Sequence, residues 1–171
     1  QFEIEPKGLK KIEHRENVLK EILSSEKVYC RTLTIMNDYF SPLFKEQKIL
    51  NEEDHNLIFG PIPQMIQTSV NLSTEISKRQ TYSSCVASVF QDMLFEFKKT
   101  SIQYFVNFNR KITDILPKLD ANPQVQSICD ETPGNPGISF QSIAVQPIHR
   151  FPRYPLLLDA LIKNTPQSHP D

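Results

Sequence analysis

The fold is decided by residues 12–44, IEHRENVLKEILSSEKVYCRTLTIMNDYFSPLF, in which Pro42 is the one proline. Large apolar side chains recur through this segment in alternating steps of three and four residues. They are Leu19, Ile22, Tyr29, Leu33, Met36, Phe40 and Leu43. Because this spacing puts them on one face of an α-helix, the segment predicts one long amphipathic helix.

Glu26 interrupts this apolar face, because the same spacing requires an apolar residue at position 26. A carboxylate that is buried without a partner costs on the order of several kcal/mol. Glu26 is therefore expected either to form an ion pair inside the fold or to lie where polar groups of another protein reach it. The residues alone favour the internal pair, and they leave contact with another protein open as the alternative.

Helical spacing continues along the rest of the chain. Asn51, with Asp54 three residues later, is typical of a helix start. A break is predicted around Pro61, between a short helix that ends at Phe59 and a second helix that restarts there.

Two more apolar stripes follow, and Ser83 or Ser84 can cap the first. The stripes consist of Val86, Val89, Phe90, Met93 and Phe97, and then of Phe105, Phe108, Ile112, Ile115 and Leu119. Pro123 opens a short helical turn, and TPGNPG at 132–137 is a loop by composition. The alternation typical of β-strands is absent. The sequence thus predicts an all-α fold, an elongated helical bundle.

The composition excludes several classes of function. The chain has 171 residues, which suits a single domain, with 13 prolines and only 4 glycines. These glycines form neither G-x-G-x-x-G nor G-x-x-x-x-G-K-[ST], which excludes dinucleotide-binding and P-loop sites. A net charge of −1 gives no electrostatic footprint for nucleic acid. No apolar run is long enough to span a bilayer, and we expect a soluble, cytoplasmic protein without direct membrane insertion.

Neither a metal centre nor a catalytic nucleophile is predicted. The histidines and cysteines are widely spaced, and the sequence contains no H-x-x-x-H, C-x-x-C or G-x-S-x-G. We therefore expect no metal, no cofactor and no covalent catalysis.

Residues 146–154, QPIHRFPRY, place polar and basic side chains among prolines. His149 and Arg153 are four residues apart, so a helix would put both on one face, with Arg150 pointing elsewhere. Prolines fix the backbone, which suits a rigid recognition surface. A kinked core helix with incidental surface charges is the alternative.

Two stretches match known sequence blocks: VLKEILSSEKVYCRTL at 18–33, and PIHRFPRYPLLL at 147–158 with TP at 165–166 and HPD at 169–171. They resemble the first block and the signature block of the Dbl homology (DH) domains, the guanine nucleotide exchange factors of Rho-family GTPases (RhoGEFs). Leu57–Gly60 and the aromatic run around Tyr104 extend the resemblance over nearly the whole chain.

This resemblance implies a helical bundle that catalyses GDP release from a Rho/Rac-type small GTPase. The bundle would bind the two switch regions of the GTPase and stabilise its nucleotide-free state, with no covalent chemistry. By the same resemblance, Glu26 engages switch I, and Arg153 meets an acidic residue of switch II. His149, Ile138 and Ser142 are implied to contact the partner.

The match also implies structural roles for Arg150, Tyr154 and Leu156–Leu158. Gln146 occupies a partner-binding position where the family has a lysine, so one positive charge is missing. His149 replaces a glutamine, and because histidine titrates near neutrality we hypothesise pH-sensitive exchange.

The family pattern continues after Asp171 with a further helix and a pleckstrin homology (PH) domain. We therefore expect residues 1–171 to be a single DH domain that is incomplete at its C-terminus, lacking its last helix. We expect any recruitment to the plasma membrane to depend on a PH domain outside these residues. A non-catalytic helical scaffold with a degenerate exchange surface is the alternative function, and a helical bundle unrelated to GTPases is the third.

Overall fold

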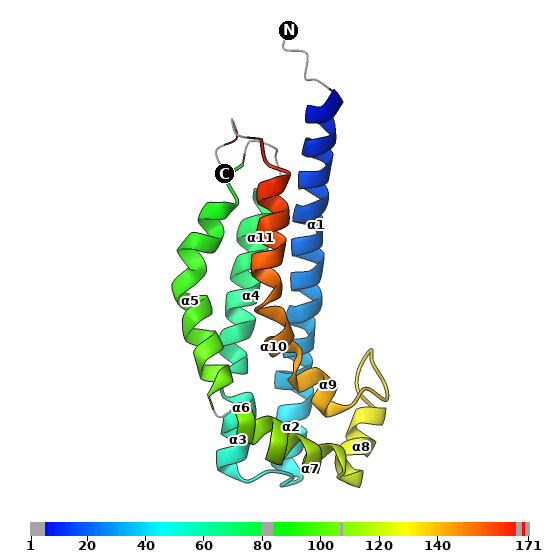
Figure 1. Ribbon diagram of the computed structural model, residues 1–171. Coiled ribbons are helices and arrows are strands. Elements are labelled where there is room, and N and C mark those ends of the chain that lie inside the picture. The colour runs from blue at the N-terminus through cyan, green and yellow to red at the C-terminus, as the bar shows by residue number, and fades with distance from the viewer. Residues whose placement is uncertain (1–5, 80–83, 107, 167–168, 170–171) are drawn as a thin grey trace.

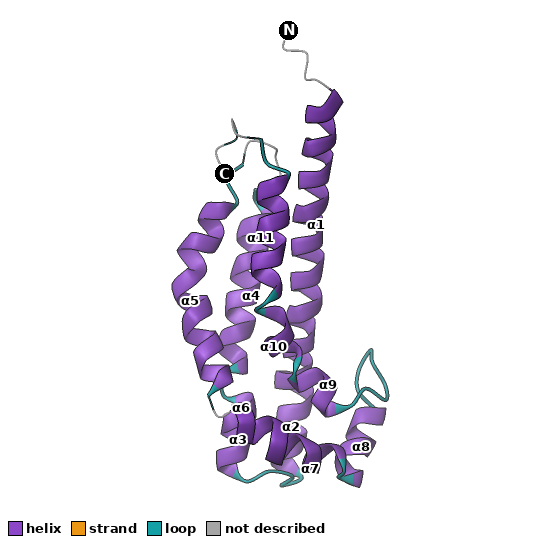
Figure 2. Ribbon diagram, in the orientation of Figure 1, coloured by secondary structure: helices purple, strands orange, loops and turns teal. Residues whose placement is uncertain are grey.

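The computed structural model describes residues 6–79, 84–106, 108–166 and 169. In these residues the regular secondary structure is entirely helical (Figure 2), which confirms the predicted all-α fold. The helices α1 (Pro6–Ile35), α4 (Ile62–Ser77), α5 (Ala87–Phe105) and α11 (Arg153–Lys163) run along the long axis, and shorter helices gather at the lower end (Figure 1). None of the helices described is both long and apolar enough to cross a membrane.

The predicted long helix consists of α1, a π-helical turn η1 (Met36–Phe40) and α2 (Ser41–Glu46), which follow one another directly. The apolar stripe is buried as predicted from Leu19 to Phe40. Beyond that point Phe44 is fully buried, whereas Leu43 is only partly buried. The prediction for Leu43 is wrong by one residue, because the wider π-turn accommodates an extra residue and rotates the buried face.

Each π-turn ends two residues before a proline: η1 before Pro42 and η2 (Lys111–Ile115) before Pro117. A proline inside a helix lacks an N–H, and its ring clashes with the carbonyl group four residues earlier. Widening the turn in front of the proline relieves this clash. The chain therefore stays helical through both prolines instead of breaking.

The helix α3 (Glu52–Phe59) begins at Asn51, whose Oδ1 accepts a 2.8 Å hydrogen bond from the backbone N–H of Asp54. Gly60 follows α3, and a Cβ at this position would lie 2.5 Å from the backbone oxygen of Asn56. A glycine therefore permits the close turn into α4. The predicted helix start and the predicted break are both confirmed.

The N-cap position of α5 is Val86, so the prediction that Ser84 caps this helix is wrong, and Ser83 lies outside the described residues. At the lower end, short helices pack around α2 and α3. They are α6 (Phe108–Arg110), α7 (Leu116–Asp120), α8 (Pro123–Asp130) and α9 (Phe140–Ala144), with η2 between α6 and α7.

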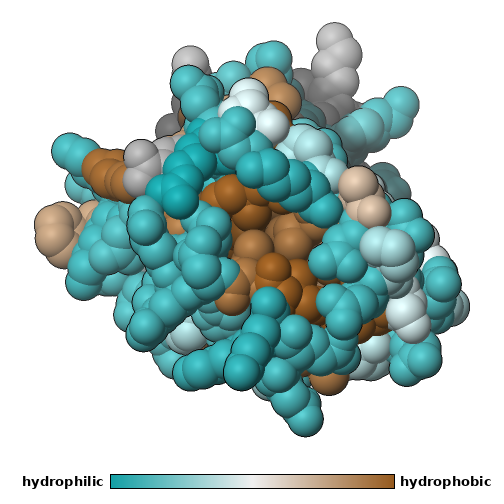
Figure 3. All heavy atoms as spheres, turned by 90° about the horizontal axis from the view of Figure 1, so that it is seen from below, coloured by the Kyte–Doolittle hydropathy of each residue, from teal (hydrophilic) through white to brown (hydrophobic). Residues whose placement is uncertain are grey.

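The core has a lower and an upper hydrophobic cluster. In the lower cluster the rings of Phe40, Phe44, Phe59 and Phe140 pack with centroids 4.8–5.8 Å apart. From the lower end, hydrophobic side chains are visible at the centre of a hydrophilic surround (Figure 3). The upper cluster joins α1, α4, α5 and α11, and Phe151 packs against both clusters.

The predicted kinked segment consists of three helices, α9, α10 (Gln146–Arg150) and α11. Pro147 lies in the first turn of α10, where a missing N–H costs no helical hydrogen bond. Phe151 and Pro152 separate α10 from α11, and Pro155 lies in the first turn of α11. Pro147 and Pro152 therefore mark the two restarts, as predicted, whereas Pro155 lies inside the first turn of α11 and makes no further break.

Candidate functional site

A groove of about 280 Å³ lies between α1 and the α10–α11 segment. One wall comes from the early part of the chain and the other from its late part, and the two walls lie side by side in the bundle (Figure 1). The groove is lined by Ser25, Val28, Tyr29 and Thr32 of α1, and by Gln146, His149, Arg150 and Arg153 of the other wall.

The rim of the groove is exposed. On α1, the side chain of Val28 is 67% exposed, although valine is apolar. On the other wall, Gln146, His149 and Arg153 are exposed, and the amide of Gln146 donates a 3.1 Å hydrogen bond to the backbone oxygen of Ser142. An exposed apolar side chain facing two basic groups is a surface suited to an acidic, partly apolar partner.

Beneath the groove, Arg150, which lines it, forms a buried ion pair with Glu26, and we call this pair with the groups bonded to it the floor. Glu26 is 0% exposed, and its Oε2 accepts hydrogen bonds from Nε of Arg150 at 3.0 Å and also from Nη2 of Arg150. The same oxygen accepts a 2.9 Å bond from the hydroxyl of Tyr154. Oε1 accepts a 2.5 Å bond from Ser69 on α4. The carboxylate is thus held from α4, α10 and α11.

The guanidinium of Arg150 completes this floor from the other side. Its Nη1 donates a 3.0 Å hydrogen bond to Oγ of Ser25, and its Cζ lies 4.6 Å from the ring centroid of Tyr154 and 5.8 Å from that of Tyr29. Stacking on aromatic rings and pairing with a carboxylate both suit a buried arginine.

Burial and the ion pair shift the pKa values of the floor residues. Burial raises the pKa of the Tyr29 and Tyr154 hydroxyls, and the negative charge of Glu26 raises both further. Burial is the largest influence on the pKa of Arg150 and lowers it, but the charge of Glu26, the nearby Tyr154 and the hydrogen bonds to both together outweigh burial, so this pKa is raised. Arg150 is therefore cationic and both tyrosines are neutral hydroxyls, which can donate hydrogen bonds.

A family model of the RhoGEF domain matches residues 18–171, which is most of the chain. The chain belongs to the RhoGEF domain family.

The curated relatives of this RhoGEF domain are much longer proteins. The chain is 32% identical over 165 residues to RhoGEF domain-containing protein gxcJ of Dictyostelium discoideum, a match that covers 94% of the chain and 14% of that protein. It is 29% identical over 161 residues to Guanine exchange factor for Rac 30 of the same organism, covering 92% of the chain and 10% of that protein. The chain therefore spans a small part of each relative.

Solved structures show the same fold. The DH/PH domains of PDZ-RhoGEF, in a complex with GTP-gamma-S activated RhoA, match with a TM-score of 0.77 at 18% identity, over 94% of this chain and 48% of that one. The linker-DH/PH domains of p115-RhoGEF match with a TM-score of 0.62 at 20% identity, over 95% and 51% of the two chains. The bundle of this RhoGEF domain is thus of the DH type.

The structure brings His149, Arg153 and Gln146 together on one wall of the groove. Ser142 is exposed on α9, one turn before Gln146. Ile138 is half-buried and packs against the lower cluster, away from the groove lining.

Glu26 requires a correction. It was expected at the partner surface on the strength of the family resemblance, yet in this RhoGEF domain it is fully buried and paired with Arg150. The internal pair, which the residues alone favoured, is what the structure shows. Arg150 does point away from His149 and Arg153, as expected, because it turns inward toward α1.

Leu156 also differs from its expected structural role, since its side chain is 67% exposed, whereas Leu157 is buried and Leu158 packs against the upper cluster.

Sequence reasoning missed the α1 wall of the groove. Ser25, Val28 and Thr32 line it, and Glu21 is exposed one turn before Ser25. These residues follow one another in steps of four, three and four, so they share one helix face. The signal available in the sequence was Val28, an apolar residue outside the buried stripe.

Proposed function

We propose that this RhoGEF domain is a guanine nucleotide exchange factor that catalyses GDP release from a Rho-family small GTPase. The observation that carries the proposal is the groove between α1 and α10–α11, whose exposed rim combines Val28 with His149 and Arg153 over a rigid, ion-paired floor. Family membership supports it, as do a relative named for exchange on Rac and the likeness to DH/PH domains in complex with RhoA.

In this proposal the GTPase seats its switch regions on the groove. Arg153 and His149 meet acidic groups of switch II, because a basic wall attracts them and repels basic surfaces. Glu21, rather than the buried Glu26, is the carboxylate available to switch I, since it is exposed on the same face as Ser25 and Val28. Gln146, Ser142 and the accessible part of Ile138 extend the contact.

Catalysis then requires no covalent step by the domain. A GTPase holds its nucleotide through backbone N–H groups, a lysine and Mg²⁺. A domain that binds the nucleotide-free conformation more tightly than the loaded one shifts the equilibrium toward release. This coupling is reciprocal, so nucleotide binding weakens the GTPase–domain complex by the same factor. Rebinding of GTP therefore frees the domain for another cycle.

The domain assignment and the cellular location are also part of this proposal. We assign residues 1–171 to a single DH domain that acts in the cytoplasm. Recruitment to the plasma membrane through a PH domain is proposed by analogy with the DH/PH structures.

The test is stimulated release of a fluorescent guanine nucleotide from a panel of RhoA-type and Rac-type GTPases. We expect the wild-type domain to accelerate release from at least one of them, and Arg153→Glu to abolish the acceleration. Wild-type release no faster than the unstimulated rate across the whole panel would contradict the proposal.

A non-catalytic scaffold is the second candidate, and one observation favours it. Gln146 carries no charge and its amide is already bonded to Ser142, so this position offers a partner less than a free lysine would. A scaffold would bind nucleotide-depleted GTPase in a pull-down assay without accelerating release. A bundle unrelated to GTPases would do neither.

A further inference from the structure

The short helix α10 forms one wall of the groove, and few polar contacts hold it in place. It has five residues and lies between the kinks at Val145 and at Phe151–Pro152. A helix this short is not stable alone, so its position is set by tertiary contacts. Arg150, at its end, turns inward to Glu26 and Ser25 of α1.

The Glu26–Arg150 pair joins the two walls of the groove directly. Ser25 and Arg150 both line the groove and are bonded to each other at 3.0 Å, while Glu26 fixes Arg150 at two nitrogens. His149 is the neighbour of Arg150 and Arg153 follows three residues later. Movement of Arg150 would therefore shift both basic groups of the rim.

We propose that Glu26 and Arg150 are positioning residues for exchange, which set the separation and orientation of the two walls without touching the GTPase. This inference rests on the proposed function. It predicts that removing the pair lowers exchange even where the fold is kept.

The deciding variant is the double substitution Glu26→Met, Arg150→Met. Because both charges are removed together, no unpaired charge is left in the core, and such replacements are often neutral for stability. We expect a folded domain whose Tm is lowered by several degrees, because the hydroxyls of Ser69 and Tyr154 lose their acceptor, and whose exchange kcat/KM is lowered at least tenfold. Exchange within twofold of wild type in the folded double variant would overturn the inference.

The matched control is Glu53→Met, Arg110→Met. This pair also joins a carboxylate and a guanidinium, at 2.6 Å, but it is exposed at the lower end of the bundle. Arg110 also pairs with Asp54 at 2.6 Å, so we expect unchanged exchange and at most a small fall in Tm. A loss of exchange equal to that of the buried double variant would overturn the inference, because it would show that charge removal anywhere is sufficient.

A spectroscopic readout separates this inference from the proposed function. The ring resonance of His149 in a proton–carbon NMR spectrum reports the position of α10, and His55, bonded to Ser41 at the lower end, serves as reference. In the buried double variant we expect the His149 resonance to shift and that of His55 to stay. If the wild-type domain stimulates no GTPase, the proposed function fails, and an unshifted His149 resonance would then overturn the positioning role independently.

Should the double variant not fold, Arg150→Lys replaces it. Lysine keeps the charge opposite Glu26 but cannot reproduce the planar, two-point attachment of a guanidinium. We expect a folded domain with exchange lowered about threefold and a shifted His149 resonance. Wild-type exchange in this variant would contradict the positioning role.

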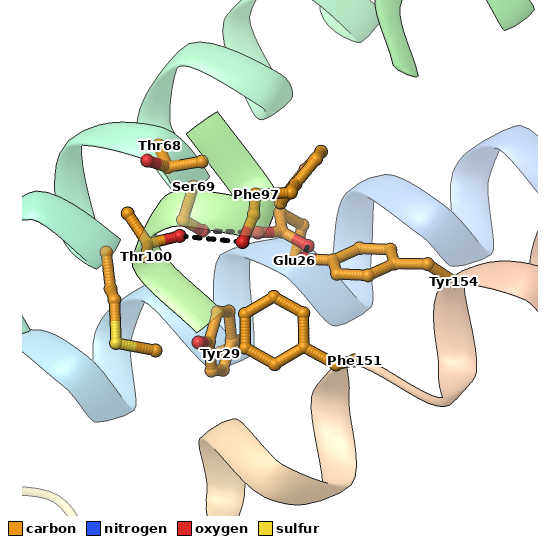
Figure 4. A pocket seen from close by; sticks show the side chains of 9 residues that line it. Glu26, Tyr29, Thr68, Ser69, Phe97, Thr100, Phe151 and Tyr154 are labelled. Atoms are coloured by element: carbon orange, nitrogen blue, oxygen red, sulfur yellow. Dashed lines mark hydrogen bonds between the residues drawn. The ribbon is translucent and has the colours of Figure 1, made fainter. Parts of the chain in front are cut away.

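A second inference rests on a different observation, a small cavity below the ion pair. It has a volume of about 10 Å³ and is lined by Glu26, Tyr29, Thr68, Ser69 and Thr100 among others (Figure 4). Tyr29 is 8% exposed, and its hydroxyl has no hydrogen-bond partner among the described residues. A volume of this size accommodates about one water molecule when polar partners surround it.

The hydrogen-bond inventory of the cavity shows what would satisfy Tyr29. The hydroxyl of Thr68 donates to the backbone oxygen of Gln64, Ser69 donates to Glu26, and Thr100 donates to the backbone oxygen of Glu96. These hydroxyl protons are committed, so the groups present only acceptor lone pairs to the cavity. A water molecule can donate two hydrogen bonds and accept up to two, so it can accept one from the tyrosine hydroxyl and donate to two of the acceptors.

We infer that this cavity binds one long-lived water molecule, which accepts a hydrogen bond from Tyr29 and donates to the hydroxyls from α4 and α5. The site is independent of any GTPase.

The substitution Tyr29→Phe tests this site by the sign of its effect. If the hydroxyl is bonded to water, its removal lowers Tm by about 2–4 °C. If it has no partner, its removal relieves an unsatisfied buried group and Tm rises, which would overturn the inference. Tyr104→Phe is the control with a known partner, since the Tyr104 hydroxyl donates a 2.6 Å bond to the backbone oxygen of Ala144. We expect its Tm to fall similarly.

A direct observation complements the stability measurement. Magnetisation transfer from bound water to the methyl group of Thr100 is expected in the wild-type domain and absent from Tyr29→Phe. No transfer in the wild-type domain would overturn the inference even if Tm falls.

Discussion

The floor and the rim of the groove use the same kinds of side chain in opposite environments. On the floor, Glu26 is 0% exposed and bonded to Arg150, whose side chain is 3% exposed. On the rim, Arg153 is exposed, and Glu21 is exposed on the same face of α1 as Ser25 and Val28. A buried charge pair is costly to break, whereas an exposed charge costs the free domain little when it is removed. A single substitution that breaks the floor pair should therefore act first on folding, whereas a rim substitution should act on partner binding alone.

Glu26→Ala tests the floor and has the largest expected effect. The substitution leaves the guanidinium of Arg150 buried without its carboxylate, so we expect the free energy of unfolding to fall by about 3–5 kcal/mol in urea denaturation. Exchange should be lost together with helicity. A variant of wild-type stability that has lost exchange would instead support the position at the partner surface that the family resemblance implied.

Arg153→Glu tests the rim by reversing one exposed charge. Like-charge repulsion at an acidic switch region should cost the complex on the order of several kcal/mol. This cost should appear as a lower exchange kcat/KM. Because Arg153 is exposed, the free energy of unfolding should change by no more than about 0.5 kcal/mol. An unchanged exchange rate would contradict the assignment of this wall.

Glu21→Ala removes the exposed acid on the α1 side of the groove. A charge-assisted hydrogen bond to the partner is worth roughly 1.5–3 kcal/mol, so we expect exchange kcat/KM to fall about tenfold to a hundredfold with stability unchanged. The matched control is Glu13→Ala, which removes an exposed acid from the same helix about two turns before Glu21. An equal loss of exchange in both variants would show that the effect reflects net charge alone.

Lys111 offers a third environment, a buried cation with no carboxylate partner among the residues that the structure describes. Its Nζ donates a 2.5 Å hydrogen bond to the backbone oxygen of Tyr104 and lies 4.2 Å from the centroid of that ring. Burial lowers the pKa of Lys111 to about 8, whereas Glu26 raises that of Arg150. Between pH 8 and the pKa of an unfolded lysine, the unfolded chain binds more protons than the folded one, so stability rises with pH.

The measurement is urea denaturation of the wild-type domain and of Lys111→Met at pH 7 and pH 9. We expect the wild-type domain to gain roughly 1 kcal/mol relative to the variant over this interval. The pKa values of Tyr29, Tyr104 and Tyr154 are raised, so these hydroxyls stay protonated and do not mask the change. Identical pH dependence in both proteins would rule out a depressed lysine pKa.

Local spacing was sufficient to predict the long first helix, the break before α4 and the restarts at Pro147 and Pro152, because each depends on residues within a turn or two. It also marked Glu26 as anomalous. It could not supply the partner of Glu26, since Arg150 is 124 positions away and the helices between them decide the contact. Nor could local spacing predict that Phe44 is the buried residue and Leu43 is not, because a π-turn changes the periodicity on which the prediction depends.

The family resemblance named Gln146, His149 and Arg153, which the structure brings together on one wall, and also Glu26, which the structure buries. Glu21 and Glu26 are five residues apart in the same block, and only their burial distinguishes them. A helix turns by about 500° over five residues, so the two carboxylates point to clearly different sides of α1. The acid that is available to a partner is therefore identified by the exposed face of α1, because the sequence match alone does not distinguish Glu21 from Glu26.

His149 gives the smallest expected effect, a pH dependence of exchange. An added positive charge on this wall, beside Arg153, would strengthen the attraction to the acidic partner that the proposed function requires. An exposed charge contributes about 0.2–1 kcal/mol, so the pH sensitivity hypothesised from the sequence would make the ratio of wild-type exchange to that of His149→Gln about 1.4-fold to fivefold higher at pH 6 than at pH 8. Taking this ratio at each pH cancels the pH dependence of the GTPase itself. A ratio that is the same at both pH values would show that His149 does not sense pH at this surface.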